Sequence, residues 1–264
     1  MTTRNTLGAI TLAAAVSMTA TVALHVHATP AEASTPISHS LSTAHKPDFA
    51  AIKDVATKKS RFFAYLSPAI NQVNAGIEHD RTQLISQFHS STPFATTSFL
   101  TTMANQYQLP IPPSGVDKAW QQAILKRVDI IPAPLVMSQA AIESGWGTSR
   151  FAVKGNNYFG QWCYTKGCGI FPHEETSGSY HEVKRFGSTT DAIQAYFTNV
   201  NTNPAYQALR DIRAQRRVDG LPLTADALAP GLIDYSQIGE KYVNEIRAMI
   251  RDDSQYMTAP SHSS

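Results

Sequence analysis

Charged side chains are scarce in this sequence, and neither sign dominates. Asp, Glu, Lys and Arg make up 16% of the 264 residues, and 22 basic against 20 acidic side chains leave a formal charge of +2. Such a balance offers no strongly basic surface, so we expect no nucleic-acid partner. Hydrophobic residues make up 42%, which excludes a disordered chain and predicts a globular protein with a substantial core.

Long apolar runs are absent after residue 24. Before it, Arg4 precedes an uncharged segment at residues 7–24, and Ala31-Glu32-Ala33 has the small-x-small pattern that signal peptidase requires. We therefore predict that residues 1–33 are a signal peptide and that the protein is exported to the periplasm or cell envelope, with no integral membrane span in the mature chain. An uncleaved N-terminal membrane anchor is the alternative, although hydroxyl residues dilute the apolar segment.

Cysteine is limited to Cys163 and Cys168. In an exported chain, two such near neighbours predict a disulfide that pins one turn, and a pair of free thiols is the alternative. The sequence has no HExxH, GxGxxG or P-loop motif, and its nine histidines form no recognisable zinc-amidase arrangement. We therefore expect no metal and no cofactor.

Composition and hydrophobic pattern predict the organisation of the chain. In the N-terminal half, Ser67 ends one segment and caps a helix that Pro68 opens, and a further helix follows at residues 116–128. The predicted parts are the signal peptide (1–33), a flexible tether (34–48), an N-terminal helical region (49–130) packed on a catalytic domain (131–252), and a disordered tail (253–264).

The catalytic domain combines helices with a short β element. Pro134 can open a helix that runs through Glu143 and that Gly145 closes in the left-handed conformation. Ser188 resembles the start of a capping box for a helix that ends near Val200. These signals predict helices on both sides of an aromatic stretch.

The remaining patterns complete the predicted fold. Residues 171–175 and 180–186 predict a β-hairpin. Asn203-Pro204 can start a helix, and a later helix is predicted to bury one apolar stripe formed by Ile238, Tyr242, Ile246 and Met249. The basic run at residues 210–217 predicts a solvated helix face, and binding of anionic wall polymers is the alternative. The fold class is therefore α+β, mainly α, with a small β-hairpin lobe.

Half of the 24 aromatic residues lie between residues 146 and 206, interspersed with glycines. Flat apolar faces with polar rims suit sugar rings, so this stretch predicts a carbohydrate groove. A small aromatic core beneath loops is the alternative. The predicted substrate contacts are Trp146, Asn157, Phe159, Trp162 and Tyr206.

Glu143 is the sharpest candidate for catalysis. It shares a helix face with Val136, Gln139 and Ala140, which points its carboxylate toward the packed side of the helix. The helix dipole disfavours negative charge in the last turn, and Ile142 would desolvate the group further. Both effects raise the pKa, as a general acid that protonates a glycosidic oxygen requires. A salt-bridged or capping glutamate is the alternative.

Two neighbouring runs carry a family resemblance. The run SQAAIESGWGTS at residues 138–149, followed by GNNYFGQW at 155–162, resembles the signature of the Bax-type glucosaminidases of glycoside hydrolase family 73. Further segments of this chain also resemble the same subfamily, so the resemblance covers roughly residues 49–252. It implies a lysozyme-like fold that cuts peptidoglycan glycan strands.

The resemblance assigns roles to individual residues. Glu143 matches the general acid, and Tyr196 sits where related glucosaminidases have a tyrosine implicated in catalysis or sugar contact. Related enzymes also offer a glutamate from a mobile β-lobe. For this second carboxylate we favour Glu182 and place Glu174 second. Neighbours on a strand face opposite ways, so Glu175 cannot point into the same groove as Glu174. Assistance by the substrate's own acetamido group is the alternative.

The leading hypothesis is an exported, monomeric endo-β-N-acetylglucosaminidase. It would cleave the β-1,4 bond from N-acetylglucosamine to N-acetylmuramic acid, and we expect no amidase activity. A muramidase or lytic transglycosylase is the first alternative, because a lysozyme-like fold with one helical glutamate can serve either bond. A non-catalytic wall-binding scaffold is the second.

Overall fold

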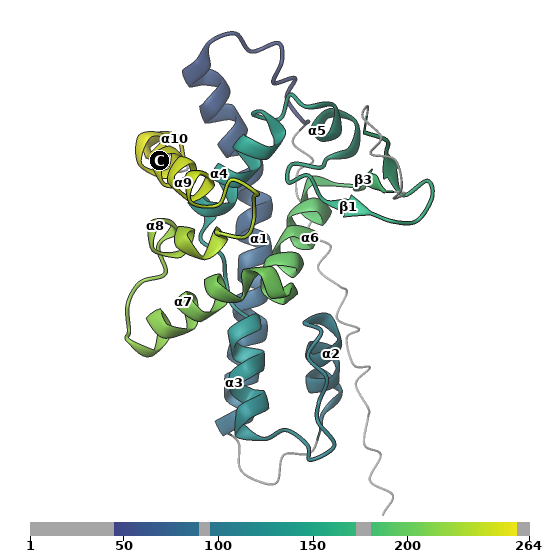
Figure 1. Ribbon diagram of the computed structural model, residues 1–264, viewed down its shortest axis with the longest axis vertical. Coiled ribbons are helices and arrows are strands. Elements are labelled where there is room, and N and C mark those ends of the chain that lie inside the picture. The colour runs from purple at the N-terminus through teal and green to yellow at the C-terminus, as the bar shows by residue number, and fades with distance from the viewer. Residues whose placement is uncertain (1–44, 90–95, 173–180, 258–264) are drawn as a thin grey trace, which may run out of the picture. The chain divides into compact units, whose positions relative to one another are not determined.

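Helices form most of the chain that the computed structural model describes, namely residues 45–89, 96–172 and 181–257. These residues also contain three short strands, so the predicted class, α+β and mainly α, is confirmed (Figure 1). The elements are α1 (Val55–His89), α2 (Ser98–Gln106), α3 (Lys118–Arg127), α4 (Ala133–Ser144), α5 (Arg150–Gly155), β1 (Trp162–Cys163), β2 (Gly169–Ile170), β3 (Glu182–Lys184), α6 (Thr189–Thr202), η1 (Pro204–Tyr206), α7 (Gln207–Val218), α8 (Ala225–Leu228), η2 (Ala229–Leu232), α9 (Glu240–Asp252) and α10 (Ser254–Met257).

The first helix, α1, is continuous over 35 residues, so the prediction that Ser67 would separate two helices is wrong. Pro68 lies inside it, where a proline removes a backbone hydrogen bond at a cost of about 3 kcal/mol. Buried side chains continue on both sides, including Leu66 and Ile70. α1 as a whole packs against α4 and α6, and burial of its apolar face outweighs the local cost.

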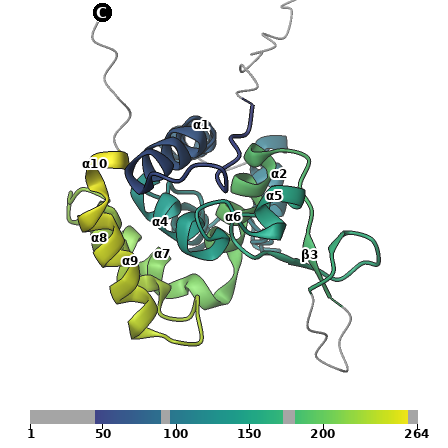
Figure 2. The same ribbon diagram turned by 90° about the horizontal axis from the view of Figure 1, so that it is seen from above.

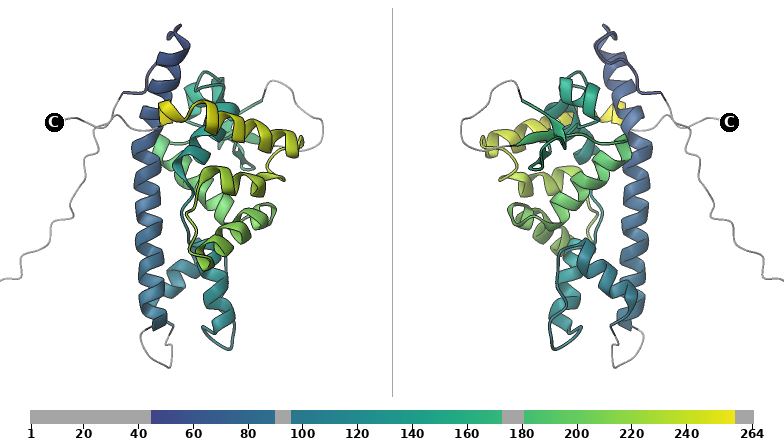
Figure 3. Two further views of the ribbon diagram at one scale, coloured as in Figure 1. Left: turned by 90° about the vertical axis from the view of Figure 1, so that its left-hand side faces the viewer. Right: turned by 90° about the vertical axis from the view of Figure 1, so that its right-hand side faces the viewer.

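Helices α2 and α3 lie beside the C-terminal half of α1 (Figure 3). The carboxylate of Asp117 caps α3 by accepting a hydrogen bond of 2.7 Å from the backbone N–H of Trp120. The indole ring of Trp120 then packs edge-on against Phe88 of α1. α3 confirms the predicted helix at residues 116–128, whereas α2 has no counterpart among the predicted helices.

The central helix is α4, which packs against α1, α8, α9 and α10. Its residues Leu135, Val136, Ala140 and Ala141 are all fully buried. Gly145 ends it in the left-handed conformation, with φ 56° and ψ 52°. The predicted helix and its glycine stop are confirmed, and Glu143 lies in the last turn.

The three strands form one antiparallel sheet in the order β1-β3-β2, with Val183 opposite both Trp162 and Ile170. The second predicted strand, at residues 180–186, contains β3. The first, at 171–175, is wrong at residues 171–172, which belong to no strand, and its remainder lies outside the described residues; β3 pairs instead with β1 and with β2, which ends at Ile170. The sheet and helices α8 to α10 lie on opposite sides of α4 and α6 (Figure 2).

Side-chain caps begin the two helices that were predicted to follow the sheet. Ser188 accepts a hydrogen bond of 3.1 Å from the backbone N–H of Asp191 at the start of α6. The side chain of Asn203 accepts one from the N–H of Ala205 at the start of η1, which leads into α7. Both predicted starts are confirmed.

Two arginines of α7 contradict the predicted solvated face. Arg210 and Arg213 are 1% and 0% exposed. Their guanidinium groups donate to backbone carbonyls, which include that of Val200 for Arg210 and that of Asp129 for Arg213. The arginines therefore connect α7 to the end of α6 and to the segment after α3 through buried backbone carbonyls.

The C-terminal helices extend the ordered region past the predicted boundary. Tyr242 and Ile246 of α9 are buried as predicted, but Ile238 precedes the helix and is 48% exposed. α10 follows, and Met257 joins the core. Residues 254–257 are thus helical, and the predicted disordered tail cannot begin at residue 253.

No helix within the three described ranges combines the length and apolar character that crossing a membrane requires.

Candidate active site

The carboxyl group of Glu143 is partly buried at the end of α4 and has a defined hydrogen-bond partner. The hydroxyl of Tyr242, on α9, donates to Glu143 Oε1 over 2.9 Å. Burial raises the pKa of the Glu143 carboxyl, and the hydrogen bond from Tyr242 offsets part of that rise by stabilising the anion. The group is therefore poised to hold a proton at a higher pH than an exposed glutamate.

Two further buried side chains continue this contact into the core. The side-chain amide of Gln139, one turn before Glu143, donates from Nε2 to the Tyr242 hydroxyl over 3.2 Å. The hydroxyl of Tyr196, on α6, donates to Gln139 Oε1. Hydrogen bonds thus run in one direction from Tyr196 through Gln139 and Tyr242 to Glu143.

Aromatic rings enclose this chain. Tyr235 stacks on Tyr242 with ring centroids 5.2 Å apart, and Tyr206 lies 5.7 Å from Tyr235. Burial raises the pKa of the Tyr196, Tyr235 and Tyr242 hydroxyls, and the negative charge of Glu143 adds to the rise. All three hydroxyls therefore remain neutral near neutral pH.

Three of the predicted substrate contacts have other partners in this structure. Phe159 is 4% exposed and stacks on Tyr196 with centroids 4.2 Å apart. Asn157 is 1% exposed, and its side chain bonds the backbone of the loop at residues 159–161 and the carbonyl of Lys184. For these two residues the alternative of an aromatic core beneath loops describes the structure better than a groove.

Trp146 is the third. Its ring lies edge-on to Phe62 and Phe63 of α1, and the Lys59 ammonium lies 5.3 Å from its centroid. The next residue, Gly147, has φ 76°, and a Cβ built there would lie 2.6 Å from the ring of Phe49. The turn that follows Glu143 is therefore packed against the N-terminal helix.

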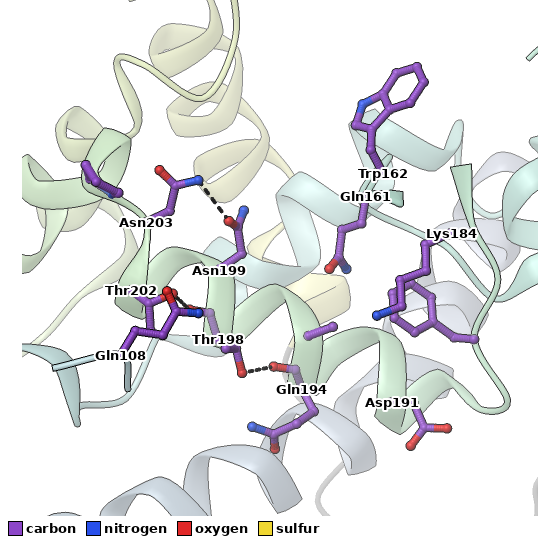
Figure 4. Close-up of a pocket in the computed structure, with 13 residues that line it drawn as sticks. Gln108, Gln161, Trp162, Lys184, Asp191, Gln194, Thr198, Asn199, Thr202 and Asn203 are labelled. Atoms are coloured by element: carbon purple, nitrogen blue, oxygen red, sulfur yellow. Dashed lines mark hydrogen bonds between the residues drawn. The ribbon is translucent and has the colours of Figure 1, made fainter. Parts of the chain in front are cut away.

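An exposed aromatic surface remains at Trp162, whose side chain is 46% exposed. It lies beside a cavity of about 710 Å³ that runs along α6, with Trp162 and Lys184 at one end and Asn199 and Asn203 at the other (Figure 4). Asn199 hydrogen-bonds the side chain of Tyr206, whose pKa is raised by burial and further by the charge of Glu143. Tyr206 thus links this cavity to the surroundings of Glu143.

Glu182 does not project into a groove as predicted. It is fully buried, and its carboxylate accepts hydrogen bonds of 2.8 Å and 2.6 Å from the backbone N–H groups of Gly167 and Gly169. Strand alternation identifies the face on which a side chain lies, but it does not show that the loop after β1 folds over that face. Glu174 and Glu175 lie outside the described residues.

The predicted disulfide between Cys163 and Cys168 is present. Their sulfur atoms and a carboxylate oxygen of Glu182 lie within 4.8 Å of one another, a grouping of potential metal ligands in the described part of the chain. The disulfide engages both sulfurs, so neither is available as a thiolate ligand.

Gln139 and Tyr242 are functional candidates that the sequence analysis did not assign. Helical periodicity placed Gln139 on the same face as Glu143, and Tyr242 belonged to an apolar stripe at residues 238–249. Only the packing of α4 against α9 shows that the two stripes meet at a hydrogen bond.

A partly desolvated carboxyl group with a raised pKa, as Glu143 has at the end of α4, is the kind of group that glycoside hydrolases use as a general acid. Residues 118–255 match the protein family described as mannosyl-glycoprotein endo-β-N-acetylglucosaminidase, and the chain belongs to this glucosaminidase family. It is also 34% identical to Protein bax of Escherichia coli (strain K12) over 222 residues, which cover 84% of this chain and 79% of that protein. No solved structure matches the chain significantly.

Proposed function

We propose that this protein is an exported endo-β-N-acetylglucosaminidase that hydrolyses peptidoglycan with Glu143 as its general acid. The observation that carries the proposal is the raised pKa of the partly buried Glu143 carboxyl at the end of α4. The bond cleaved is the β-1,4 bond from N-acetylglucosamine to N-acetylmuramic acid. The family match supports the glycosidase class, and residues 1–33 support export.

In this mechanism Glu143 transfers its proton to the glycosidic oxygen as the bond from that oxygen to the anomeric carbon breaks. Positive charge then develops on the sugar ring, and water finally adds at the anomeric carbon and returns a proton to the Glu143 carboxylate. The two amide donors on Glu182 favour assistance by the acetamido oxygen of the substrate over a base from β3, because Glu182 would have to break both bonds to reach the sugar. Tyr196 acts through Gln139 and does not touch substrate.

The cavity beside α6 supports a binding role for Trp162. Its exposed ring offers an apolar face for a sugar, and neighbouring amide side chains such as Gln161 and Asn199 offer hydrogen bonds to hydroxyl and acetamido groups. A glycan strand seated there would reach Asn199 at the other end, which hydrogen-bonds Tyr206.

Digestion of purified peptidoglycan by the wild type and by Glu143→Gln tests the proposal. The exchange keeps shape and polarity but removes the proton, so we expect turnover to fall by about 10²–10⁴-fold while the melting temperature is unchanged. Mass spectrometry of wild-type products should show N-acetylglucosamine at the reducing end.

Other results would contradict the proposal in distinct ways. Activity of the variant within about fivefold of the wild type would remove Glu143 from the acid role. An anhydromuramic end would identify a lytic transglycosylase, a reducing-end N-acetylmuramic acid would identify a muramidase, and binding without cleavage would identify a scaffold.

A further inference from the structure

The hydrogen bonds that lead to Glu143 have a fixed direction. An amide side chain offers an acceptor at Oε1 and donors at Nε2, and both ends of Gln139 are engaged. Oε1 accepts from Tyr196, so Nε2 donates to the oxygen of Tyr242. The hydroxyl proton of Tyr242 is then directed to Glu143 Oε1.

This direction has a consequence for the protonated form of Glu143. Since Oε1 already accepts the Tyr242 proton, an acidic proton on the same oxygen would oppose the donor. We propose that Gln139 is a positioning residue that holds Tyr242 as a donor to Oε1 and thereby confines the catalytic proton of Glu143 to Oε2. The proposal rests on the proposed function of Glu143 as general acid.

The ionisable groups around Glu143 allow the effect of Tyr242 on its carboxyl group to be measured separately. Four tyrosines face Glu143 from the elements around α4, namely Tyr196 on α6, Tyr206 on η1, Tyr235 before α9 and Tyr242 on α9, and burial raises the pKa of each. On α1 and at the end of α9, Lys59 and Asp253 form an ion pair of 2.6 Å with each other. Tyr242 is the neighbour that hydrogen-bonds Glu143 and so favours its anion.

The first test is Tyr242→Phe. Loss of the donor destabilises the Glu143 anion, so the pKa of Glu143 rises, the acid stays protonated to higher pH, and the basic limb of the kcat profile moves up by about one pH unit. We expect kcat to fall about tenfold, because the acid is no longer oriented, with KM unchanged.

The second test is Gln139→Glu, which retains Tyr242. The introduced carboxylate accepts from both tyrosines, so the Tyr242 proton turns away from Glu143 and the basic limb again moves up. In the Tyr242→Phe background the same exchange should add little, because no hydroxyl proton remains to be redirected. Equal shifts in both backgrounds would mean that the introduced charge acts directly, and would overturn the proposal.

Tyr235→Phe is the matched control. Its hydroxyl belongs to the same aromatic group but donates to the carbonyl of Phe159, so the basic limb should stay in place. Carbon-13 NMR titration of the Glu143 carboxyl gives its pKa directly if a variant turns over too slowly to measure. An unchanged limb and pKa in Tyr242→Phe, in an enzyme that still requires Glu143, would overturn the positioning role alone. Full activity of Glu143→Gln would instead overturn the proposed function.

Discussion

The Glu182 carboxylate illustrates a residue whose partners decide its role. In Glu182→Gln the amide nitrogen cannot accept a hydrogen bond, so one of the two N–H groups from Gly167 and Gly169 stays unpaired. We predict that the free energy of unfolding falls by about 1–3 kcal/mol, while kcat changes less than about threefold. Urea unfolding and peptidoglycan turnover give the two quantities.

The control for Glu182 is Glu78→Gln, at an exposed position of α1, which should change stability by about 0.5 kcal/mol or less. A strong loss of turnover in Glu182→Gln at unchanged stability would instead support a catalytic base on β3.

The helix face on which a residue lies was predictable from local periodicity. The helical spacing of Gln139 and Glu143 placed both on the packed face of α4, and the structure agrees. The partner of Glu143 was not predictable, because Tyr242 lies 99 residues further along the chain. Which hydroxyl meets which carboxylate depends on how α4 and α9 pack, and no local pattern records that.

The loop between β1 and β2 has little regular structure and is closed by the disulfide between Cys163 and Cys168. The disulfide closes residues 163–168 beside the exposed rings of Trp162 and Tyr164. Chain entropy gives such a small loop only about 2 kcal/mol. We therefore predict that reduction of the disulfide lowers peptidoglycan turnover strongly, whereas it lowers the melting temperature only slightly.

Assays with and without a thiol reductant measure this effect, and the double exchange of both cysteines to serine serves as a reductant-independent control. Unchanged turnover in the reduced protein would show that the loop does not shape the site.

Helices α1, α3 and α7 meet at a buried carboxylate. Asp129 is 1% exposed and lies 2.7 Å from Arg217, 3.5 Å from Arg81 and 3.8 Å from Arg213. Asp129→Asn leaves these cations without their counter-charge, and we predict a loss of about 3–5 kcal/mol in the free energy of unfolding. Chemical denaturation measures it.

An exposed ion pair provides the comparison for Asp129. Asp211 pairs with Lys126 over 2.8 Å, and both side chains are about half exposed. Asp211→Asn should therefore cost only about 0–1 kcal/mol. Similar losses in the two variants would show that burial does not strengthen the Asp129 cluster.

Elements with strong end signals were predicted well, and those without were not. Ser188, Asn203 and Gly145 mark helix ends that the structure confirms. Pro68 gave a false start, because buried packing on both sides of it keeps α1 continuous. The strands are only two or three residues long, too short for alternation to fix their bounds.

At the scale of the whole molecule, the hydrophobic core extends beyond the residues that match the family. The match begins at Lys118, but the core includes Phe62 and Phe63 of α1 together with Tyr158 and Phe197. The sequence predicted helices before residue 118. It did not show that rings of α1 contact Trp146, three residues after Glu143.

The contact between Phe49 and Gly147 bears on how such an enzyme can be inherited or engineered. The family match alone would place the start of a transferable domain at Lys118. A cassette cut at Lys118 would omit the ring that covers the turn after Glu143, although every residue of the Glu143 hydrogen-bond chain would be present. Gene fusions that preserve hydrolysis should therefore carry the segment from Phe49 through α1 with the matched region, as one transferable unit.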